Sequence, residues 1–176
     1  MEIDSCDPGA FGAFAVYDGQ ALQVLDMPTF IEKAGKLGRP RRFIDPAGVV
    51  AYLTERRLMG GRTLVMERVG GIPGQAAHAA FVFGHGAGLI MGAAMALGFT
   101  VHTVPAARWK GAMRVPADKD LAVKHADALL PDHAHLWRVE RGSVNKLQAS
   151  GRAEAALIGA YGRLVYGQGE PADDRP

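Results

Sequence analysis

The chain has 176 residues, of which 48% are hydrophobic and 22% are charged, and its formal net charge is +2. This length and balance exclude a disordered chain and predict one globular domain with a sizeable hydrophobic core. The small net charge does not mark a nucleic-acid-binding protein, so any basic surface has to be local. The single cysteine, Cys6, excludes an internal disulfide framework.

We expect residues 1–166 to form the domain. Residues 167–176 are polar, contain two prolines and are expected to form a flexible C-terminal tail. The N-terminus lacks a basic segment followed by an apolar one, so no signal peptide is expected. These features predict a cytoplasmic protein, either of a bacterium or of a phage in its host.

The N-terminal residues predict a meander of three short strands. The strands are expected over residues 2–6, 13–17 and 21–25. The residues between them, Asp7-Pro8-Gly9 and Asp18-Gly19, are typical of turns.

A basic segment and a helix follow the meander. Segment 31–44 is broken by glycine and proline and is predicted to be a loop, either solvated or in contact with phosphate. Its basic residues are Lys33, Lys36, Arg39, Arg41 and Arg42. Asp45 as the N-cap and Pro46 at the first helical position predict a helix that ends near residues 58–61.

Two acidic residues lie at the ends of predicted strands. Glu67 follows the apolar, β-favouring run 63–66, which lies between two glycine pairs. A carboxylate at the exit of a buried strand is costly unless something pairs with it, and Arg68 points to the opposite face. Glu67 is therefore either a solvated strand end or a metal ligand. Asp7 is either a turn cap or a metal ligand, and Asp4 is a weaker alternative to it.

Residues 75–99 contain no Asp, Glu, Lys or Arg, and they predict a helix over 75–98. Gly84, Gly88 and Gly92 share one face of that helix and allow another backbone to approach closely. The length would permit a membrane span. We reject that interpretation, because two histidines interrupt the segment and no basic clusters flank it. A buried helix is expected instead, packed on a sheet or against a second subunit.

The C-terminal part predicts a strand over 100–104 and helices over 118–130 and 151–165, with a turn or helix after Pro105. Trp109 is expected to lie in the core. The element order, β-β-β-α-β-α-β-α-α, is a meander followed by α/β alternation. It predicts an α/β fold with a mixed sheet and helices on both faces.

Three sequence segments centre on acidic residues. They are CDPGAFGAFAV around Asp7, LVMERVGGIPGQ around Glu67 and SGRAEAALIGAYG around Glu154. Together they resemble the RuvC-like Holliday junction resolvases, especially the phage and bacterial members, with the chloroplast resolvase as a relative. Two more segments, GFTVHTVPAARWKGAM and DKDLAVKHADALLP, fit the family in order and spacing, so the likeness spans roughly residues 5–163.

The resemblance implies an RNase H-like fold with a mixed five-stranded sheet, a homodimer, and symmetric cutting of four-way DNA junctions with Mg²⁺ or Mn²⁺. Phosphodiester hydrolysis needs a positioned water and a stabilised leaving oxygen, which two divalent ions about 4 Å apart can supply. Because Mg²⁺ takes hard oxygen ligands, Asp7, Glu67 and Glu154 are expected to hold two ions per active site. The resemblance makes Asp7 the carboxylate that bridges both ions.

The resemblance also implies roles for basic residues. Lys110 is expected near the scissile phosphate as a catalytic residue. The expected DNA contacts are Lys110, with Lys119 and Arg152 as weaker candidates, and Arg41 and Arg42 from the basic segment.

One position departs from the family pattern. The family has an aspartate one helical turn before the helix glutamate, from where both acids can reach one site, and this chain has Ser150 there. A serine hydroxyl can contact Mg²⁺ but brings no charge. We include Ser150 among the catalytic and metal-binding residues, as a natural or an engineered replacement, and expect slow cutting of DNA.

Two other functions stay open. One is an RNase H-like nuclease that acts on other branched DNA or on RNA. The other is a non-catalytic protein that binds DNA structures, which the serine at position 150 favours. No membrane partner is expected.

Overall fold

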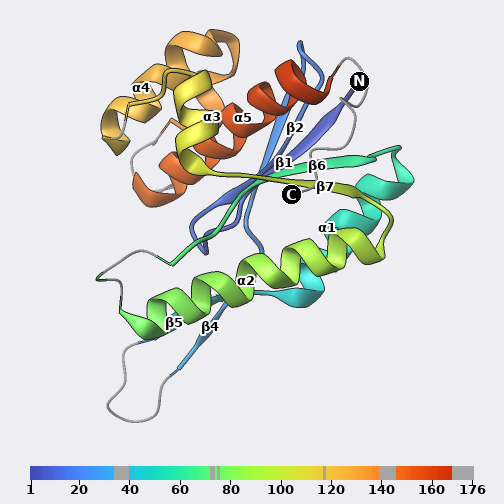
Figure 1. Cartoon of the computed structure of the whole chain (residues 1–176), viewed down its shortest axis with the longest axis vertical. Helices are drawn as coiled ribbons and strands as arrows, with labels where there is room; N and C mark the ends of the chain where they lie inside the picture. Colours follow the sequence, from blue (N-terminus) through green and yellow to red (C-terminus); the bar gives the residue numbers. More distant parts are fainter. Residues whose placement is uncertain (34–39, 72–73, 75, 117, 139–145, 168–176) are drawn as a thin grey trace.

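The computed structural model describes residues 1–33, 40–71, 74, 76–116, 118–138 and 146–167. Its centre is a mixed five-stranded sheet in the order β3-β2-β1-β6-β7 (Figure 1). The strands are β1 (Ile3–Asp7), β2 (Ala13–Tyr17), β3 (Leu22–Asp26), β6 (Thr63–Glu67) and β7 (Thr100–Val104). β2 is antiparallel to β1 and β3, whereas β6 is parallel to β1 and β7. The predicted α/β class with a mixed five-stranded sheet is confirmed.

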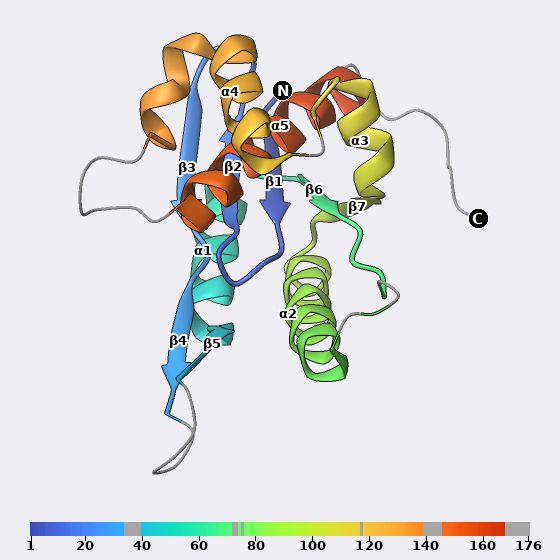
Figure 2. The same cartoon turned by 90° about the vertical axis from the view of Figure 1, so that its left-hand side faces the viewer.

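Helices cover both faces of the sheet (Figure 1, Figure 2). One face carries α3 (Ala106–Ala112), α4 (Lys119–Leu129), the 3-10 helix η1 (Pro131–Leu136) and α5 (Lys146–Tyr166). The other face carries α1 (Pro46–Leu58) and α2 (Ala77–Ala96).

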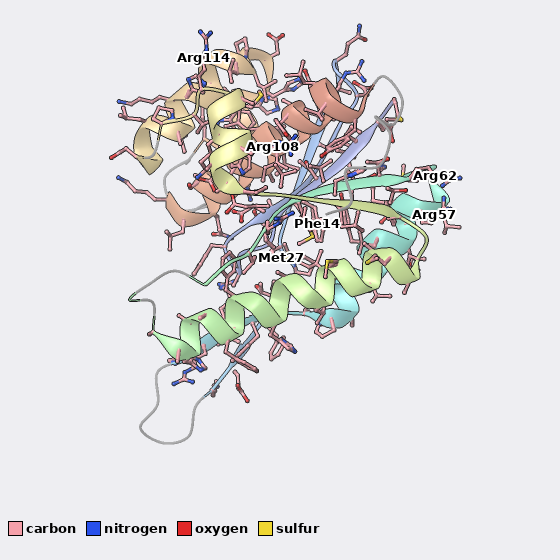
Figure 3. The ribbon with its side chains drawn as sticks, in the orientation of Figure 1. Phe14, Met27, Arg57, Arg62, Arg108 and Arg114 are labelled. Carbon is pink, nitrogen blue, oxygen red and sulfur yellow. The ribbon has the colours of Figure 1, made fainter. Side chains whose placement is uncertain are left out.

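Alternating side chains of the strands supply two hydrophobic cores. Ile3 of β1 and Val65 of β6 point toward α5 and share a core with Trp109. Phe14 and Met27 belong to the opposite core, between the sheet and α2 (Figure 3). Because side chains alternate along a strand, the last residues of β1 and β6 also project toward α5.

Helix α1 begins as the sequence predicts, whereas α5 begins earlier. Asp45 Oδ1 accepts a hydrogen bond from the backbone N–H of Ala47 at 3.1 Å, and Pro46 is the first helical residue. Helix α5 starts at Lys146 instead of near residue 151, because its first turns also pack, with Ser150 only 5% exposed. Ser150 therefore lies within the helix, not before it.

The predicted loop over 31–44 is wrong at both ends, which form a hairpin of β4 (Thr29–Glu32) and β5 (Arg41–Ile44). Phe30 and Phe43 pair across this hairpin with ring centroids 5.8 Å apart, and such cross-strand aromatic pairs stabilise two-stranded ribbons. Lys36 and Arg39 lie outside the described residues.

Helix α2 turns a side other than its glycine row toward the sheet. Its buried residues are Gly86, Ala87, Ile90 and Ala94. Gly84, Gly88 and Gly92 are exposed, and a Cβ built on any of them would have no heavy atom within 4 Å. Of the two partners that the sequence leaves open for this row, the sheet of the same chain is excluded, and a second subunit stays a prediction.

Helix α2 also has the length and composition of a membrane-spanning helix. Within the described part of the chain it is the one such helix, with a mean hydropathy of 1.5 over a window that is 22% buried. It packs against α1 and β7, so it forms part of the helical layer on this face of the sheet. The face that carries the glycine row is open to another surface.

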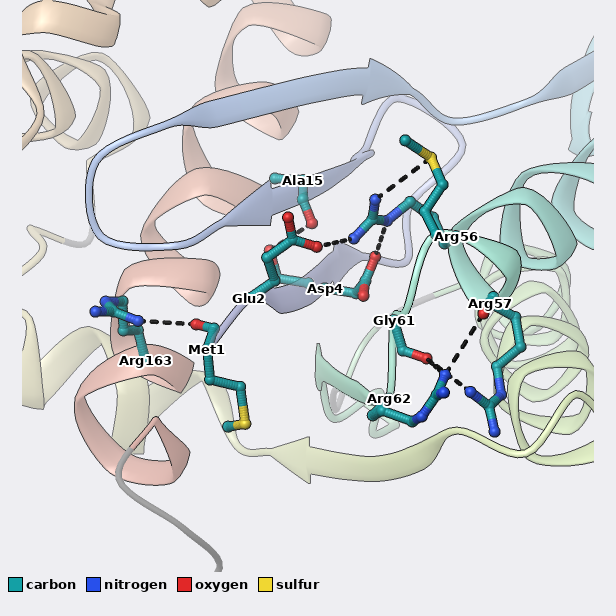
Figure 4. Close-up of polar contacts among 11 residues, drawn as sticks. Met1, Glu2, Asp4, Ala15, Arg56, Arg57, Gly61, Arg62 and Arg163 are labelled. Atoms are coloured by element: carbon teal, nitrogen blue, oxygen red, sulfur yellow. Dashed lines mark hydrogen bonds and ion pairs between the residues drawn. The ribbon is translucent and has the colours of Figure 1, made fainter.

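Asp4 of β1 points away from Asp7, toward α1. It is 1% exposed, and its Oδ1 accepts a hydrogen bond from Arg56 Nε at 2.7 Å, while Arg56 Nη2 donates to Glu2 Oε2 at 2.7 Å (Figure 4). Burial raises the pKa of Asp4, and the Arg56 guanidinium opposes that shift. Asp4 therefore forms a structural ion pair and does not compete with Asp7 for a metal.

Replacing Arg56 with alanine should cost roughly 3–5 kcal/mol of unfolding free energy at pH 8, because the Asp4 carboxylate stays buried without its counter-ion. The loss should shrink toward pH 4. A buried acid with a raised pKa is protonated below that pKa, and stability falls as the pH rises through it. Urea unfolding at both pH values measures the effect. Arg62→Ala, which removes an exposed arginine, is the control, and equal losses in the two variants would contradict this account.

Candidate active site

The candidate site lies at the edge of the sheet where β1 and β6 both end. These parallel neighbours are in register at Cys6 and Met66, so the next residues, Asp7 and Glu67, are neighbours at that edge. Both follow the alternation of their strands and project toward α5, and both are partly exposed. The fold therefore brings together two acids that are distant in the sequence.

The loop after β1 and helix α5 touch through their backbones. Asp7 Oδ1 accepts a hydrogen bond from the N–H of Gly9 at 3.3 Å, which holds the loop in a turn. A Cβ on Gly12 would collide with the carbonyl oxygen of Asp7, and a Cβ on Gly151 would collide with that of Phe11. Glycine at position 151 therefore lets the helix approach the loop this closely, and glycine at position 12 lets the loop fold back on Asp7.

Helix α3 connects the acid of β6 with the acid of α5. Trp109 Nε1 donates a hydrogen bond to Glu67 Oε2 at 2.8 Å, and Lys110 Nζ forms an ion pair with Glu154 Oε1 at 3.1 Å. Lys110 Nζ also lies 5.2 Å from the centroid of the Trp109 ring. Trp109 is fully buried, which confirms its predicted place in the core, but its bond to Glu67 has no signal in the sequence.

The donor chemistry of this edge suits a hard cation, but the present arrangement is not a closed metal site. Asp7, Glu67 and Glu154 offer the carboxylate oxygens that Mg²⁺ prefers. Among the described residues, however, no group of three or more His, Cys, Asp or Glu side chains is placed to hold a metal ion. Lys110 pairs with Oε1 of Glu154, so a metal at this carboxylate would compete with the lysine or share the carboxylate with it.

Ser150 lies one helical turn before Glu154, on the same side of α5. Only 5% of it is exposed, and it adjoins Gly151, which touches the loop after Asp7. The serine is therefore fixed beside the acidic edge, while its role toward a metal stays a prediction.

The predicted DNA-contact residues differ in their surroundings. The guanidinium of Arg152 binds Asp26 through two hydrogen bonds of 2.6 and 2.7 Å, and this interaction raises the pKa of Arg152. Arg152 thus anchors α5 to the end of β3, and its predicted phosphate contact stays a prediction. Arg41 and Arg42 lie on β5. The side chain of Lys119 lies outside the described residues.

Comparison with known proteins supports the architecture. No protein-family model matches the chain, and no curated protein matches its sequence. The mixed sheet with helices on both faces is an RNase H-like fold, and solved structures share it over nearly the whole chain.

Two of these structures are of RuvC from Thermus thermophilus. The structure of T. thermophilus RuvC in complex with Holliday junction substrate has 14% identity and a TM-score of 0.56, covering 94% of this chain and 96% of that chain. Another Thermus thermophilus RuvC structure has 16% identity and a TM-score of 0.53, covering 93% and 96%. The chain therefore has a RuvC-like fold.

Metal affinity should respond in opposite directions to two substitutions at the acidic edge. Lys110→Ala removes a cation that holds Glu154 and should tighten Mn²⁺ binding by at least about tenfold, because a nearby positive charge opposes the metal. Asp7→Asn removes a ligand charge and should weaken it. Titration calorimetry without DNA measures both, and Lys124→Ala on the exposed side of α4 is the control. If Lys110→Ala binds Mn²⁺ as the unchanged chain does, the lysine does not face the metal.

Proposed function

We propose that the chain is a metal-dependent endonuclease that resolves four-way (Holliday) DNA junctions by paired symmetric nicks. The observation that carries this proposal is the position of Asp7 and Glu67, which end neighbouring parallel strands and face the helix that carries Glu154. Separated sequence segments thus supply acids to one edge, as hydrolysis of a phosphodiester demands. The RuvC-like fold supports the choice of junction DNA as substrate.

The residues of the acidic edge would have different roles in this reaction. Asp7, Glu67 and Glu154, with the hydroxyl of Ser150, would hold two Mg²⁺ or Mn²⁺ ions. These ions, when bound, supply an activated water and stabilise the leaving oxygen. Trp109 orients Glu67 through its indole N–H. Lys110, once parted from Glu154, donates to the scissile phosphate.

A second candidate function follows from Ser150. A neutral hydroxyl stands where the resembling family has a charged ligand, and it is buried beside the acidic edge. A chain with one acid fewer holds a hard cation less well. Binding of DNA junctions without cutting is therefore the alternative, whereas RNase H-like action on other branched DNA or on RNA has no observation of its own here.

We infer that the active form is a homodimer joined through the open face of α2. That face carries Gly84, Gly88 and Gly92 together with Phe81 and Met95, which are 68% and 60% exposed. Large apolar side chains gathered on one exposed helix face mark an interaction surface. Two coordinated nicks across a symmetric junction also need two active sites.

Binding to DNA of different shapes tests the proposed substrate. Affinity for a four-way junction should exceed that for a linear duplex of equal length and should fall steeply with salt, because phosphate contacts release counter-ions. Gel shifts in EDTA with junction, fork, duplex and single strand, followed by cleavage with Mg²⁺, separate the candidates. A resolvase cuts the junction in pairs of symmetric nicks, and a binding protein cuts none of these DNAs. Equal affinity for junction and duplex would exclude junction-specific function.

Ser150→Asp should raise Mg²⁺-dependent cutting of a synthetic junction by at least about tenfold, since a restored ligand that improves the barrier by 1.36 kcal/mol gives that factor. Denaturing gels of end-labelled strands measure the nicks. Ser150→Asn, which has a similar size but no charge, is the matched control and should stay slow. If the unchanged chain cuts as fast as the aspartate variant, or the variant stays inert on every branched DNA, this account of position 150 is wrong.

Gly88→Leu should separate dimerisation from folding. The position is exposed, and a Cβ added there would meet no heavy atom within 4 Å, so the monomer should stay as stable as before or gain up to about 1 kcal/mol from helix propensity. The dimer should dissociate, because the larger side chain keeps the second backbone away. Sedimentation measures the oligomeric state and urea unfolding the stability. Gly86→Leu, which collides with Ile44, should instead destabilise the monomer, and a monomeric unchanged chain on junction DNA would refute the dimer.

A further inference from the structure

A cavity of about 450 Å³ lies on the far side of the loop that follows Asp7. The loop, strand β5 and the first half of α2 form its walls. Its lining includes Pro8 and Phe11 from the loop, Arg41 and Phe43 from β5, and Phe83 from α2. This volume suits one small ligand or one nucleotide, since small-molecule pockets measure roughly 300–1,000 Å³.

The lining combines aromatic rings with cations. Of the described residues that line it, three are phenylalanines and the polar ones are Arg41, Arg42 and His78, with no acidic residue among them. The guanidinium carbon of Arg42 lies 5.1 Å from the centroid of the Phe11 ring. Aromatic faces with arginine beside them are the surface on which single-stranded nucleic acids stack their bases.

Hydrogen bonds hold both guanidinium groups in place. Arg42 Nη1 donates to Thr29 Oγ1 at 2.7 Å, and Arg41 Nη1 donates to His78 Nε2 at 2.9 Å, so that ring nitrogen is the acceptor. Each of these bonds uses one of the five N–H groups of an arginine, so other N–H groups are left to bind a phosphate. The charge of the pocket therefore complements a nucleotide.

The position of the cavity relates it to the acidic edge. Pro8 lines the cavity and directly follows Asp7, so one short loop separates the two sites. Figure 2 shows the end of β1 between α5 and α2, with this loop between the two layers. A DNA strand held at Asp7 can therefore pass Phe11 and reach the cavity.

We propose that this cavity binds one unpaired nucleotide of the DNA strand held at the Asp7 edge, with its base among Phe11, Phe43 and Phe83 and its phosphate at Arg41 and Arg42. The proposal rests on the proposed function and adds the unpaired nucleotide to its substrate. Branched DNA supplies such nucleotides where strands exchange, at a lower cost than intact duplex does. The pocket thereby gives the protein a means to choose where at a branch the strand is placed.

The test compares two four-way junctions that differ in one base. Both carry one unpaired nucleotide at the branch point, a thymidine in one and an abasic residue in the other, so that the phosphates are the same. Fluorescence anisotropy in EDTA measures binding without cleavage. The unchanged chain should bind the thymidine junction about tenfold more tightly, which is the size of one base–aromatic stacking contact.

Variants locate the base. Phe83→Ala should reduce the preference for thymidine to less than about twofold without weakening binding of the abasic junction. Leu58→Ala is the control, because it removes an apolar side chain that is 83% exposed at the end of α1 and lines neither the cavity nor the open face of α2. Arg41→Ala, at an exposed position that tolerates change, should weaken both junctions equally and lower the salt slope by about one. It tests the pocket even if Phe83→Ala fails to fold.

Three results would overturn the pocket. The first is equal affinity of the unchanged chain for the two junctions. The second is a Phe83→Ala variant that prefers the thymidine junction as strongly as the unchanged chain does. The third is a Phe83→Ala variant whose only change is its oligomeric state, which would assign the cavity to contacts between copies. Failure of the proposed function has a separate sign, which is equal affinity of the protein for a four-way junction and a linear duplex. Loss of the base preference with junction binding intact rejects only the pocket.

Discussion

The site depends on one close approach between two backbones. Helix α5 lies against the loop after β1 at Gly151, where a Cβ would collide with the carbonyl oxygen of Phe11, and Gly12 lets the same loop fold back on the carbonyl oxygen of Asp7. Glycine within a helix costs about 1 kcal/mol against alanine, and the close packing offsets this cost. The contact fixes the turn of α5 that carries Ser150 directly beside the strand end that carries Asp7.

Other contacts keep α5 in that position along its length. Ser5 Oγ donates to the carbonyl of Ala155 at 2.8 Å, which ties the middle of the helix to β1. The bidentate pair of Arg152 with Asp26 ties it to β3, and the planar fork of such a pair favours one geometry over others. Arg152, which the sequence suggests as a DNA contact, therefore has a structural partner in Asp26, and its charge helps to position α5.

Much of the fold follows from local patterns, whereas the contacts of the site do not. Strand alternation and the cap at Asp45 depend on nearest neighbours, so the sequence predicts them. The hairpin is hidden in the sequence because its pairing of Phe30 with Phe43 crosses a segment rich in glycine and proline. The pair of Lys110 with Glu154 joins residues on separate helices, and only packing reveals it. Glycine spacing on α2 predicts a face for close packing, but it does not tell that the row points away from the sheet.

Helix α3 contacts the acidic edge through one hydrogen bond and one ion pair. Adjacent residues, Trp109 and Lys110, each hold one carboxylate, of Glu67 and of Glu154. Both contacts come from one helix of seven residues, so a displacement of α3 would shift the partners of both carboxylates at once. The geometry of the acidic edge is thus set jointly by two neighbouring side chains of one short helix.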